Sequence, residues 1–210
     1  MTISSLSKPT QPPGELMTTT PLPAGTTPLP AGTTPLPAGT WQLDTGATTV
    51  NVSVKMLGVF TVPATLAVAS GTIEIDANHE VTGVDITVDA SSYSSKIAKR
   101  NKHVLSSDFL DTDNHATISF RAEHVSSNDA SSTDATHTSA TYTSAGVVTI
   151  KGQSSPVDVV IAGVDVTGDT GSFTATATVD RTAIGVGKLS TLVIGQDLQI
   201  EVAAIARRVS

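Results

Sequence analysis

The sequence predicts an all-β protein that closes into an antiparallel barrel of about eight strands, with one helical segment between the third and fourth strands. The first observation is composition: Thr, Val and Ile together make up 68 of the 210 residues. These side chains branch at Cβ, so they pack well on a pleated sheet and lose rotamer freedom in a helix. The second is a recurring alternation of apolar and polar residues, which is the pattern of a strand with one face exposed to solvent.

Composition and charge exclude several classes of protein. The chain is 39% hydrophobic and 15% charged, which is too apolar for a disordered protein and not apolar enough for a membrane protein. A formal net charge of −7 speaks against binding to nucleic acid. The chain has no cysteine, which excludes disulfide scaffolds, thiolate metal sites and cysteine nucleophiles.

Residues 1–40 predict a disordered tail rich in Thr and Pro, and residues 41–210 predict one folded domain. Three copies of the heptapeptide TPLPAGT begin at Thr20, Thr27 and Thr34. Each copy carries two prolines, which lack an amide donor and cannot join a central sheet. The repeat is typical of a stiff, solvated tether, and the alternative is a polyproline-type ligand for an aromatic groove.

The predicted strands follow one another along the folded domain. The clearest alternation occurs in four segments, at residues 50–56, 84–89, 118–123 and 173–179. In residues 60–75 the apolar positions switch phase across Ser70 and Gly71, which indicates a bulge or a barrel corner. Weaker runs complete the set of about eight strands, at residues 142–151, 157–161 and 198–206.

Two further segments interrupt the strands. Residues 93–106 contain neither Gly nor Pro and carry an incomplete apolar stripe, so they predict the helical segment. Residues 126–139 contain only Ser, Thr, Asn, Asp, Ala and one His, which predicts a mobile hairpin loop.

The interior of the predicted barrel is expected to be open. An antiparallel sheet with one apolar face must close into a barrel or stack as a sandwich to bury that face. A barrel of about eight strands is just wide enough to hold one small ligand. The inward positions are mostly Val, Ala and Ile, and the chain has only four Phe, two Tyr and one Trp with which to fill a lumen.

Segments spread over residues 41–210 resemble one protein family. They are 41–44 (WQLD), 54–58 (VKMLG), 70–76 (SGTIEID), 101–111 (NKHVLSSDFLD), 116–120 (ATISF) and 148–152 (VTIKG), then Asp180, Arg181 and Gly185. Their order and spacing resemble the YceI-like family, whose members form an extended, lipocalin-like barrel and bind isoprenoids or other long-chain amphiphiles. The chain departs from the family's usual residues at four places, which are Pro63, Leu110, His115 with Ala116, and Ile184.

The resemblance implies binding, and sequestration or transport, of a long-chain apolar amphiphile such as a polyisoprenoid, an isoprenoid quinone or a similar lipid. Burial of the chain's apolar surface would drive binding, so neither a catalytic residue nor a cofactor is expected beyond this lipid. The candidate ligand-binding residues are the inward positions of the strands, Val52, Val54, Phe60, Val62, Ile86, Ile118, Phe120, Val159, Ile161, Phe173, Ala175, Ala177, Ile200 and Val202. The alternative for each of them is ordinary core packing.

Five bases are candidates for contact with a phosphate or carboxylate headgroup. Four of them, Lys96, Lys99, Arg100 and Lys102, lie within seven residues on the helical segment, and Arg181 lies at a strand end. They suit a headgroup if they border the mouth of the barrel. The alternatives are a solvated helix face for the first four and, for Arg181, an ion pair with Asp180 that fixes the following turn.

Two other functions remain as alternatives. A hydrolase or isomerase acting on a lipid-like substrate would need His103 or His115 within hydrogen-bond reach of Asp108 or Asp111 inside the cavity. A structural or interaction module would have a barrel filled by side chains and would act through the proline-rich tail. The histidines show no metal-ligand spacing, so no metal site is assigned.

The expected partner is the lipid itself, with no nucleic acid and no transmembrane segment, and a homodimer is left open. As written, the N-terminus has no apolar run of the length that a secretory signal requires, so a cytoplasmic location is expected. A periplasmic or extracellular location is expected instead if the N-terminus is trimmed or wrongly assigned.

Overall fold

A computed structural model describes residues 36–128, 141–187 and 193–210 of the chain. The tail at residues 1–35, with most of the heptapeptide repeats, lies outside the described residues, as do residues 129–140 of the expected loop. The remaining part of that loop, Ser126–Asn128, is not a loop but a short strand paired with Thr141–Thr143.

Strands dominate the described part of the chain, which confirms the predicted fold class. The strands are β1 (Gly39–Leu43), β2 (Thr49–Met56), β3 (Phe60–Ile75), β4 (Val81–Ser94), β5 (Thr117–Ala122), β6 (Ser126–Asn128), β7 (Thr141–Ile150), β8 (Gln153–Thr167), β9 (Thr170–Asp180) and β10 (Ile194–Arg208). One helix, α1 (Ala98–Leu105), lies between β4 and β5. In the described ranges no helix is long and apolar enough to cross a membrane.

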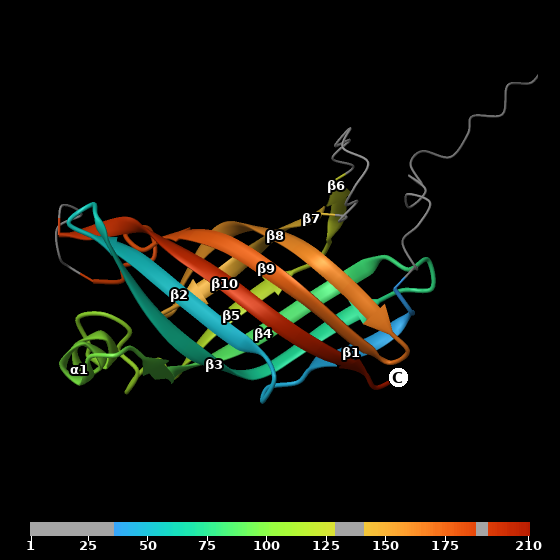
Figure 1. Ribbon diagram of the computed structural model, residues 1–210, viewed down its shortest axis with the longest axis horizontal. Helices are drawn as coiled ribbons and strands as arrows, with labels where there is room; N and C mark the ends of the chain where they lie inside the picture. The colour runs from blue at the N-terminus through green and yellow to red at the C-terminus, as the bar shows by residue number, and fades with distance from the viewer. Residues whose placement is uncertain (1–35, 129–140, 188–192) are drawn as a thin grey trace, which may run out of the picture.

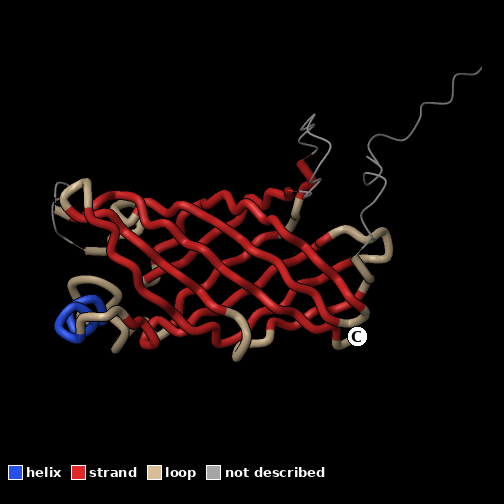
Figure 2. The backbone as a smooth tube through the Cα atoms, in the orientation of Figure 1, coloured by secondary structure: helices blue, strands red, loops and turns tan. Residues whose placement is uncertain are grey.

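The sheet closes on itself because β10 pairs with β2 on one side and with β9 on the other. The closed ring contains eight antiparallel strands in the order β2-β3-β4-β5-β7-β8-β9-β10. Figure 1 shows these strands winding obliquely around a long barrel, with α1 at one end and β1 and the C-terminus at the other. The tube view in Figure 2 shows the same arrangement, with the helix beside the strand ends. We refer below to the α1 end and the β1 end.

Strand β1, like β2, lies between β10 and β3, but nearer the β1 end of the barrel. It pairs with β10 through Trp41 and Arg208 and with β3 through Trp41 and Ile73, whereas β2 pairs with the other halves of these two strands. A turn separates β1 from β2, and in it the Asp44 carboxylate accepts hydrogen bonds from the amides of Gly46 and Ala47. The last two residues of the expected tail, Gly39 and Thr40, are therefore part of the sheet.

The phase change predicted in the second long strand appears as a bulge in β3. Val68 pairs with Val88 and Ser70 pairs with Thr87, so Ala69 is an extra residue without a partner of its own in β4. Two residues later, Gly71 lies directly against the side chain of Leu43, which leaves no room for a Cβ. The bulge and the glycine thus let β1 close over this part of the barrel.

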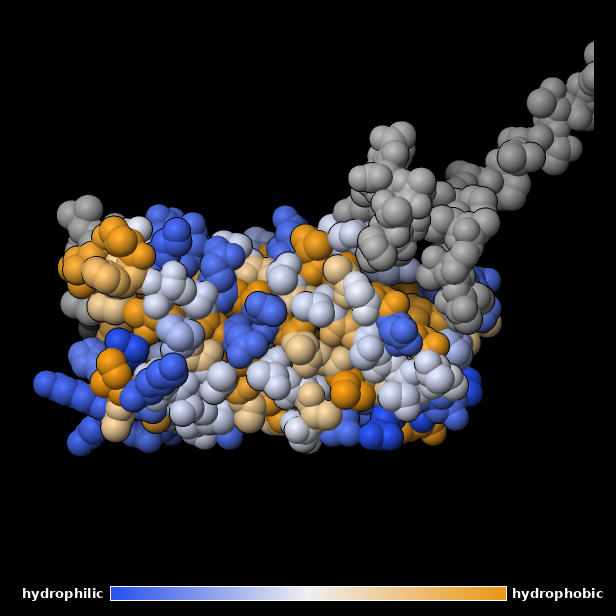
Figure 3. All heavy atoms as spheres, in the orientation of Figure 1, coloured by the Kyte–Doolittle hydropathy of each residue, from blue (hydrophilic) through white to orange (hydrophobic). Residues whose placement is uncertain are grey.

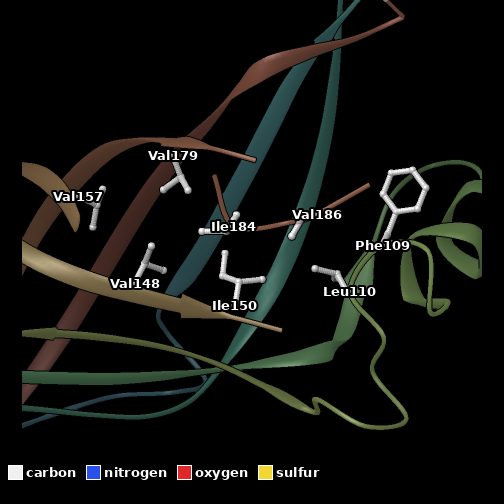
Figure 4. Close-up of a cluster of buried hydrophobic side chains, with 8 residues drawn as sticks. All are labelled: Phe109, Leu110, Val148, Ile150, Val157, Val179, Ile184 and Val186. Carbon is white, nitrogen blue, oxygen red and sulfur yellow. The ribbon is translucent and has the colours of Figure 1, made fainter. Parts of the chain in front are cut away.

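Buried side chains form one cluster near each end. The cluster at the β1 end consists of Trp41, Leu43, Val50, Val68, Ile75, Ala204 and Ala206. The cluster at the α1 end, shown in Figure 4, consists of Phe109, Leu110, Val148, Ile150, Val157, Val179, Ile184 and Val186. Part of the second cluster comes from the loops after α1 and β9, which fold over the strand ends.

The helix is shorter than the predicted segment 93–106. Tyr93 and Ser94 still belong to β4, because Ser94 pairs with Thr65 of β3. Between strand and helix the side-chain oxygen of Asn101 accepts hydrogen bonds from the Ser95 amide, at 2.8 Å, and the Ser95 hydroxyl, at 2.6 Å. None of the eight residues of α1 is buried, so the helix lies on the rim rather than in the core.

Candidate functional site: an apolar cavity in the barrel

A cavity of about 570 Å³ lies inside the barrel, and all eight strands of the ring contribute to its wall. The wall is almost entirely apolar. Its polar members are Ser53, Tyr93, Lys99, Arg100, His103, Thr176 and Arg181. A volume of this size falls within the roughly 300–1,000 Å³ that small-molecule sites occupy. The barrel is therefore hollow, which speaks against the alternative of an interior filled by side chains.

The registers of the strands explain why the apolar positions meet in one lining. Val52 of β2 is paired with Ala64 on one side and with Ile200 on the other. Ala177 of β9 is likewise paired with Val159 and Ile200. Paired residues on adjacent strands point to the same face of a sheet, so the alternating apolar residues of each strand all face inward. Because many of them are Val or Ala, their side chains do not reach across the lumen.

Twelve of the fourteen candidate ligand-binding residues lie on the wall of the cavity. They are Val52, Val54, Val62, Ile86, Ile118, Phe120, Val159, Phe173, Ala175, Ala177, Ile200 and Val202. Their contact with a ligand stays a prediction.

The other two candidates do not lie on the cavity wall. Phe60 has the inward parity of β3, but it is paired with Met56 beside the β2–β3 turn and its side chain is 65% exposed. Ile161 has the parity of the lining residue Val159 and is half-buried, yet it is paired with Tyr142 near the start of β7 and does not reach the cavity wall.

Sequence reasoning missed many lining residues. Those on strands are Val50, Met56, Ala64, Leu66, Val68, Val88, Val148, Ile150, Val157, Val179, Ile194 and Leu198. Most continue the alternation of strands already recognised, so the same signal could have found them. Others lie around α1 and in the loops, namely Tyr93, Ile97, Val104, Phe109, Leu110 and Val186, and no strand period marks them.

The cavity ends in a floor near the β1 end of the barrel. Val50, Val68, Phe173 and Val202 line its deepest part. Val50 and Val68 belong to the buried cluster that contains Trp41, and Phe173 and Val202 pack against that cluster. The Trp41 indole N–H donates a hydrogen bond of 3.0 Å to the Pro37 carbonyl oxygen, so this side chain is held by the residues that precede β1.

The mouth lies at the α1 end, where the lining becomes polar and exposed. Lys99, Arg100 and His103 of α1 border the cavity there, and the His103 ring meets the ring of Phe109 edge to face at a centroid distance of 4.9 Å. Burial raises the pKa of the Tyr93 phenol, and the nearby positive charge of Arg100 acts in the opposite direction. Of the four bases expected at the mouth, Lys99 and Arg100 line it, whereas Lys96 and Lys102 do not.

Arg181 lines the same end of the cavity, where its side chain binds main-chain carbonyl groups. The side chain is buried, and its guanidinium donates hydrogen bonds to the carbonyl oxygens of Val186, Gly187, Ile194 and Gly195, at distances between 2.8 and 3.2 Å. These bonds tie the loop after β9 to the start of β10. The neighbouring Asp180 carboxylate accepts hydrogen bonds from the Thr182 hydroxyl and the Gln196 amide, which helps to lower its pKa from 3.8 to about 2.

The acid–base pair that an enzyme would need is not assembled in the described part of the chain. No hydrogen bond there joins the imidazole of His103 or His115 to a carboxylate such as that of Asp108 or Asp111. His103 is exposed at the mouth, and His115 lies beside Gly152, away from the cavity wall. No group of three or more metal-ligating side chains occurs within the described residues.

Comparisons with known proteins agree with this architecture. A family model for the YceI-like domain matches residues 41–206. A search of curated proteins finds no match.

Several solved structures share the fold. The crystal structure of BcnA from Burkholderia cenocepacia aligns with a TM-score of 0.63 at 18% identity, over 78% of this chain and 98% of that chain. A polyisoprenoid-binding domain from Saccharophagus degradans, implicated in plant cell wall breakdown, aligns with a TM-score of 0.59 at 10% identity, over 80% and 98% of the two chains. The YceI protein of Campylobacter jejuni aligns with a TM-score of 0.55 at 19% identity, over 67% and 81%.

Proposed function

Because this chain belongs to the YceI-like family, we propose that its barrel binds a long-chain apolar amphiphile inside the cavity and sequesters or transports it without chemical change. The single observation that carries the proposal is the cavity itself, with its apolar wall, its floor near the β1 end and its polar mouth beside α1. Such a cavity removes apolar surface from water, which contributes roughly 25 cal/mol for each Å² buried.

The length of the lining favours a chain-like ligand. Val50 lies at the floor and Met56 near the mouth, and both line the cavity from the same strand. Six residues of extended chain span about 20 Å. A ligand that fills this length must be long and narrow, and the scarcity of polar groups along the wall disfavours one that carries hydroxyls or charges along its length.

We propose a polyprenyl chain as the ligand, as in an isoprenoid quinone or a lipid carrier. A polyisoprenoid is apolar along its length and carries its polar group at one end, which matches a cavity whose charged lining side chains lie at the mouth. The likeness in fold to a polyisoprenoid-binding domain supports this choice. In this arrangement the chain occupies the lumen and the headgroup lies beside Lys99 and Arg100.

Titration with isoprenoid alcohols of increasing length tests the proposal. The displacement of an apolar dye, N-phenyl-1-naphthylamine, by farnesol, geranylgeraniol and longer prenols would be measured in solution, with glucose as a negative control. We expect saturable binding of one alcohol per barrel and an affinity that rises with chain length until the cavity is full. A protein that binds none of these alcohols, or that binds short and long ones equally, would contradict the proposal.

A further inference from the structure

Exposed apolar side chains gather around the α1 end of the barrel. The described part of the chain has eight large hydrophobic side chains that are exposed, and four of them are at one tip: Leu57 (60%), Val59 (77%), Phe60 (65%) and Val193 (39%). A fifth, Ile97 (49%), immediately precedes α1 across the mouth. In Figure 3 the tip is an orange patch at one end of the molecule, with blue side chains of the α1 region beside it.

The tip is a continuation of the cavity wall. The Leu57 amide donates a hydrogen bond of 3.0 Å to the Val193 carbonyl oxygen, so the β2–β3 turn and the residue before β10 are joined. The next residues inward, Met56 and Ile194, are paired with each other and both line the cavity. An apolar path therefore runs from the tip into the lumen.

The turn holds its apolar residue in a conformation that leucine rarely adopts. Leu57 has φ of +50° and Gly58 has φ of +69°. Asn, Asp or Gly would fit the first of these positions with less strain. A solvent-exposed leucine at a strained turn position contributes nothing to the core, which favours a role at the surface.

On the α1 side of the mouth lie four bases that form no ion pair with any residue the structure describes. The three ion pairs among the described residues use Arg121, Arg207 and Arg208. The four bases at and just before α1, Lys96, Lys99, Arg100 and Lys102, take no part in them. Acidic residues follow the helix, yet none forms an ion pair with these bases within the described ranges. Four bases thus cluster within seven residues at this end, in a chain with a net charge of −7.

We propose that the α1 end docks on an anionic lipid bilayer, with the tip of Leu57, Val59, Phe60 and Val193 inserted at the surface and the four bases against lipid phosphates. Apolar side chains next to Lys and Arg are the combination that binds a membrane interface. Docking in this orientation places the mouth of the cavity against the bilayer. The inference goes beyond the proposed function, because it concerns the outer surface and holds whichever molecule the cavity takes.

A lipid surface suits this end better than a second copy of the chain. A symmetric dimer through the tip would place the four bases of one copy near those of the other, and like charges disfavour that contact. A bilayer that contains anionic lipid supplies the opposite charge. Asp180 of β9 and Asp197 of β10 are also at this end, where they are register partners across the two strands. They lie further from the tip than Val193 and Ile194.

Flotation with vesicles tests the docking surface. The full-length protein would be mixed with vesicles of phosphatidylcholine alone or of phosphatidylcholine and phosphatidylglycerol in equal parts. The tip variant would be L57N/V59S/F60S, in which Asn also suits the positive φ at position 57. The matched control is V160T/V209S, which changes two exposed valines elsewhere (41% and 55% exposed). A charge variant, K96Q/K102Q, changes two bases that do not line the cavity.

We expect the wild type and the control to float with the mixed vesicles, and the tip variant to float roughly tenfold less, because insertion of apolar side chains supplies much of the affinity. The charge variant should float less than the wild type with the mixed vesicles, and should behave like the wild type with vesicles of phosphatidylcholine alone. A tip variant that floats like the wild type would overturn the proposal. A wild-type protein that does not float would also overturn it. The same holds if the wild type does not float but forms a dimer that is lost in the tip variant.

The dye-displacement assay, run on the same proteins, separates this inference from the proposed function. The tip variant should bind geranylgeraniol in solution like the wild type, because its altered side chains lie outside the cavity wall. Alcohol binding without flotation would overturn the docking surface alone, and flotation without alcohol binding would overturn the cavity function alone.

Discussion

The ring of Phe120 lies against the main chain at Gly146 on the neighbouring strand. A Cβ at position 146 would stand 2.5 Å from Phe120 Cε2 and 2.7 Å from the Arg121 carbonyl oxygen. Phe120 and Gly146 are diagonal neighbours, because Phe120 is paired with Val148 and Ala122 with Gly146. The glycine thus makes room for an aromatic ring on the cavity wall.

Replacement of Gly146 by Ala should destabilise the protein by about 1–3 kcal/mol, the usual effect of overpacking. Urea unfolding of G146A, F120A and G146A/F120A gives the coupling between the two positions. We expect the Gly146→Ala change to be less destabilising in the F120A background, with part of the effect remaining because of the Arg121 carbonyl. An equal effect in both backgrounds would show that the ring is not what the glycine accommodates.

A bulky residue in the lumen should exclude ligand without unfolding the barrel. Ala177 lines the cavity, and the adjacent Thr178 is exposed on the outside of the same strand. A177F should weaken geranylgeraniol binding by at least about tenfold, or 1.4 kcal/mol, while T178F should bind like the wild type. Dye displacement gives the affinities and circular dichroism checks the fold. Equal affinities for the two variants would count against a ligand in the lumen.

The bases at the mouth should discriminate between headgroups. Lys99 and Arg100 line the cavity and Lys102 does not. We expect K99Q/R100Q to weaken binding of a polyprenyl phosphate by roughly up to fivefold, as exposed ion pairs contribute about 0.2–1 kcal/mol. Binding of the uncharged alcohol should not change, and K102Q serves as the control. Loss of phosphate binding in K102Q as well would indicate general charge attraction and not a headgroup site.

Asp180 should contribute to the decline of stability in acid. Hydrogen bonds from the Thr182 and Gln196 side chains lower its pKa from 3.8 to about 2. Because the folded-state pKa is the lower one, the contribution is complete above about pH 4 and is lost as pH falls through about 2. Thermal unfolding between pH 6 and pH 2 should therefore show less pH dependence for D180N than for the wild type. D158N, at an exposed position on β8, should keep the wild-type slope.

The sequence alone was sufficient to predict the barrel and twelve of the residues on its inner face. Alternation in β2, β4, β5 and β9 identifies the face that each strand turns inward, because side chains alternate strictly across a strand. That period says nothing about height along the barrel axis. Phe60 and Ile161 have the inward parity but do not line the cavity, which the alternation alone does not show.

Other parts of the site depend on contacts between segments far apart in the chain. Phe109 reaches the cavity from a loop, and Gly187 makes room for its ring, with a Cβ there placed 2.6 Å from Phe109 Cε1. The headgroup interpretation of Arg181 treated it as a surface cation, whereas the fold buries its guanidinium among main-chain carbonyls. The strand β1 was also missed, because five residues beside a proline-rich tail carry too short a pattern.

The most direct test of the central claim is mass spectrometry of what the purified protein carries. Native mass spectra of the intact wild type would be compared with those of A177F, and organic extracts of both with an extract of an unrelated protein. The account predicts a stoichiometric isoprenoid or similar long-chain lipid on the wild type and its depletion from A177F. A wild-type protein that is folded, carries no lipid and takes up none of the added prenols would contradict it.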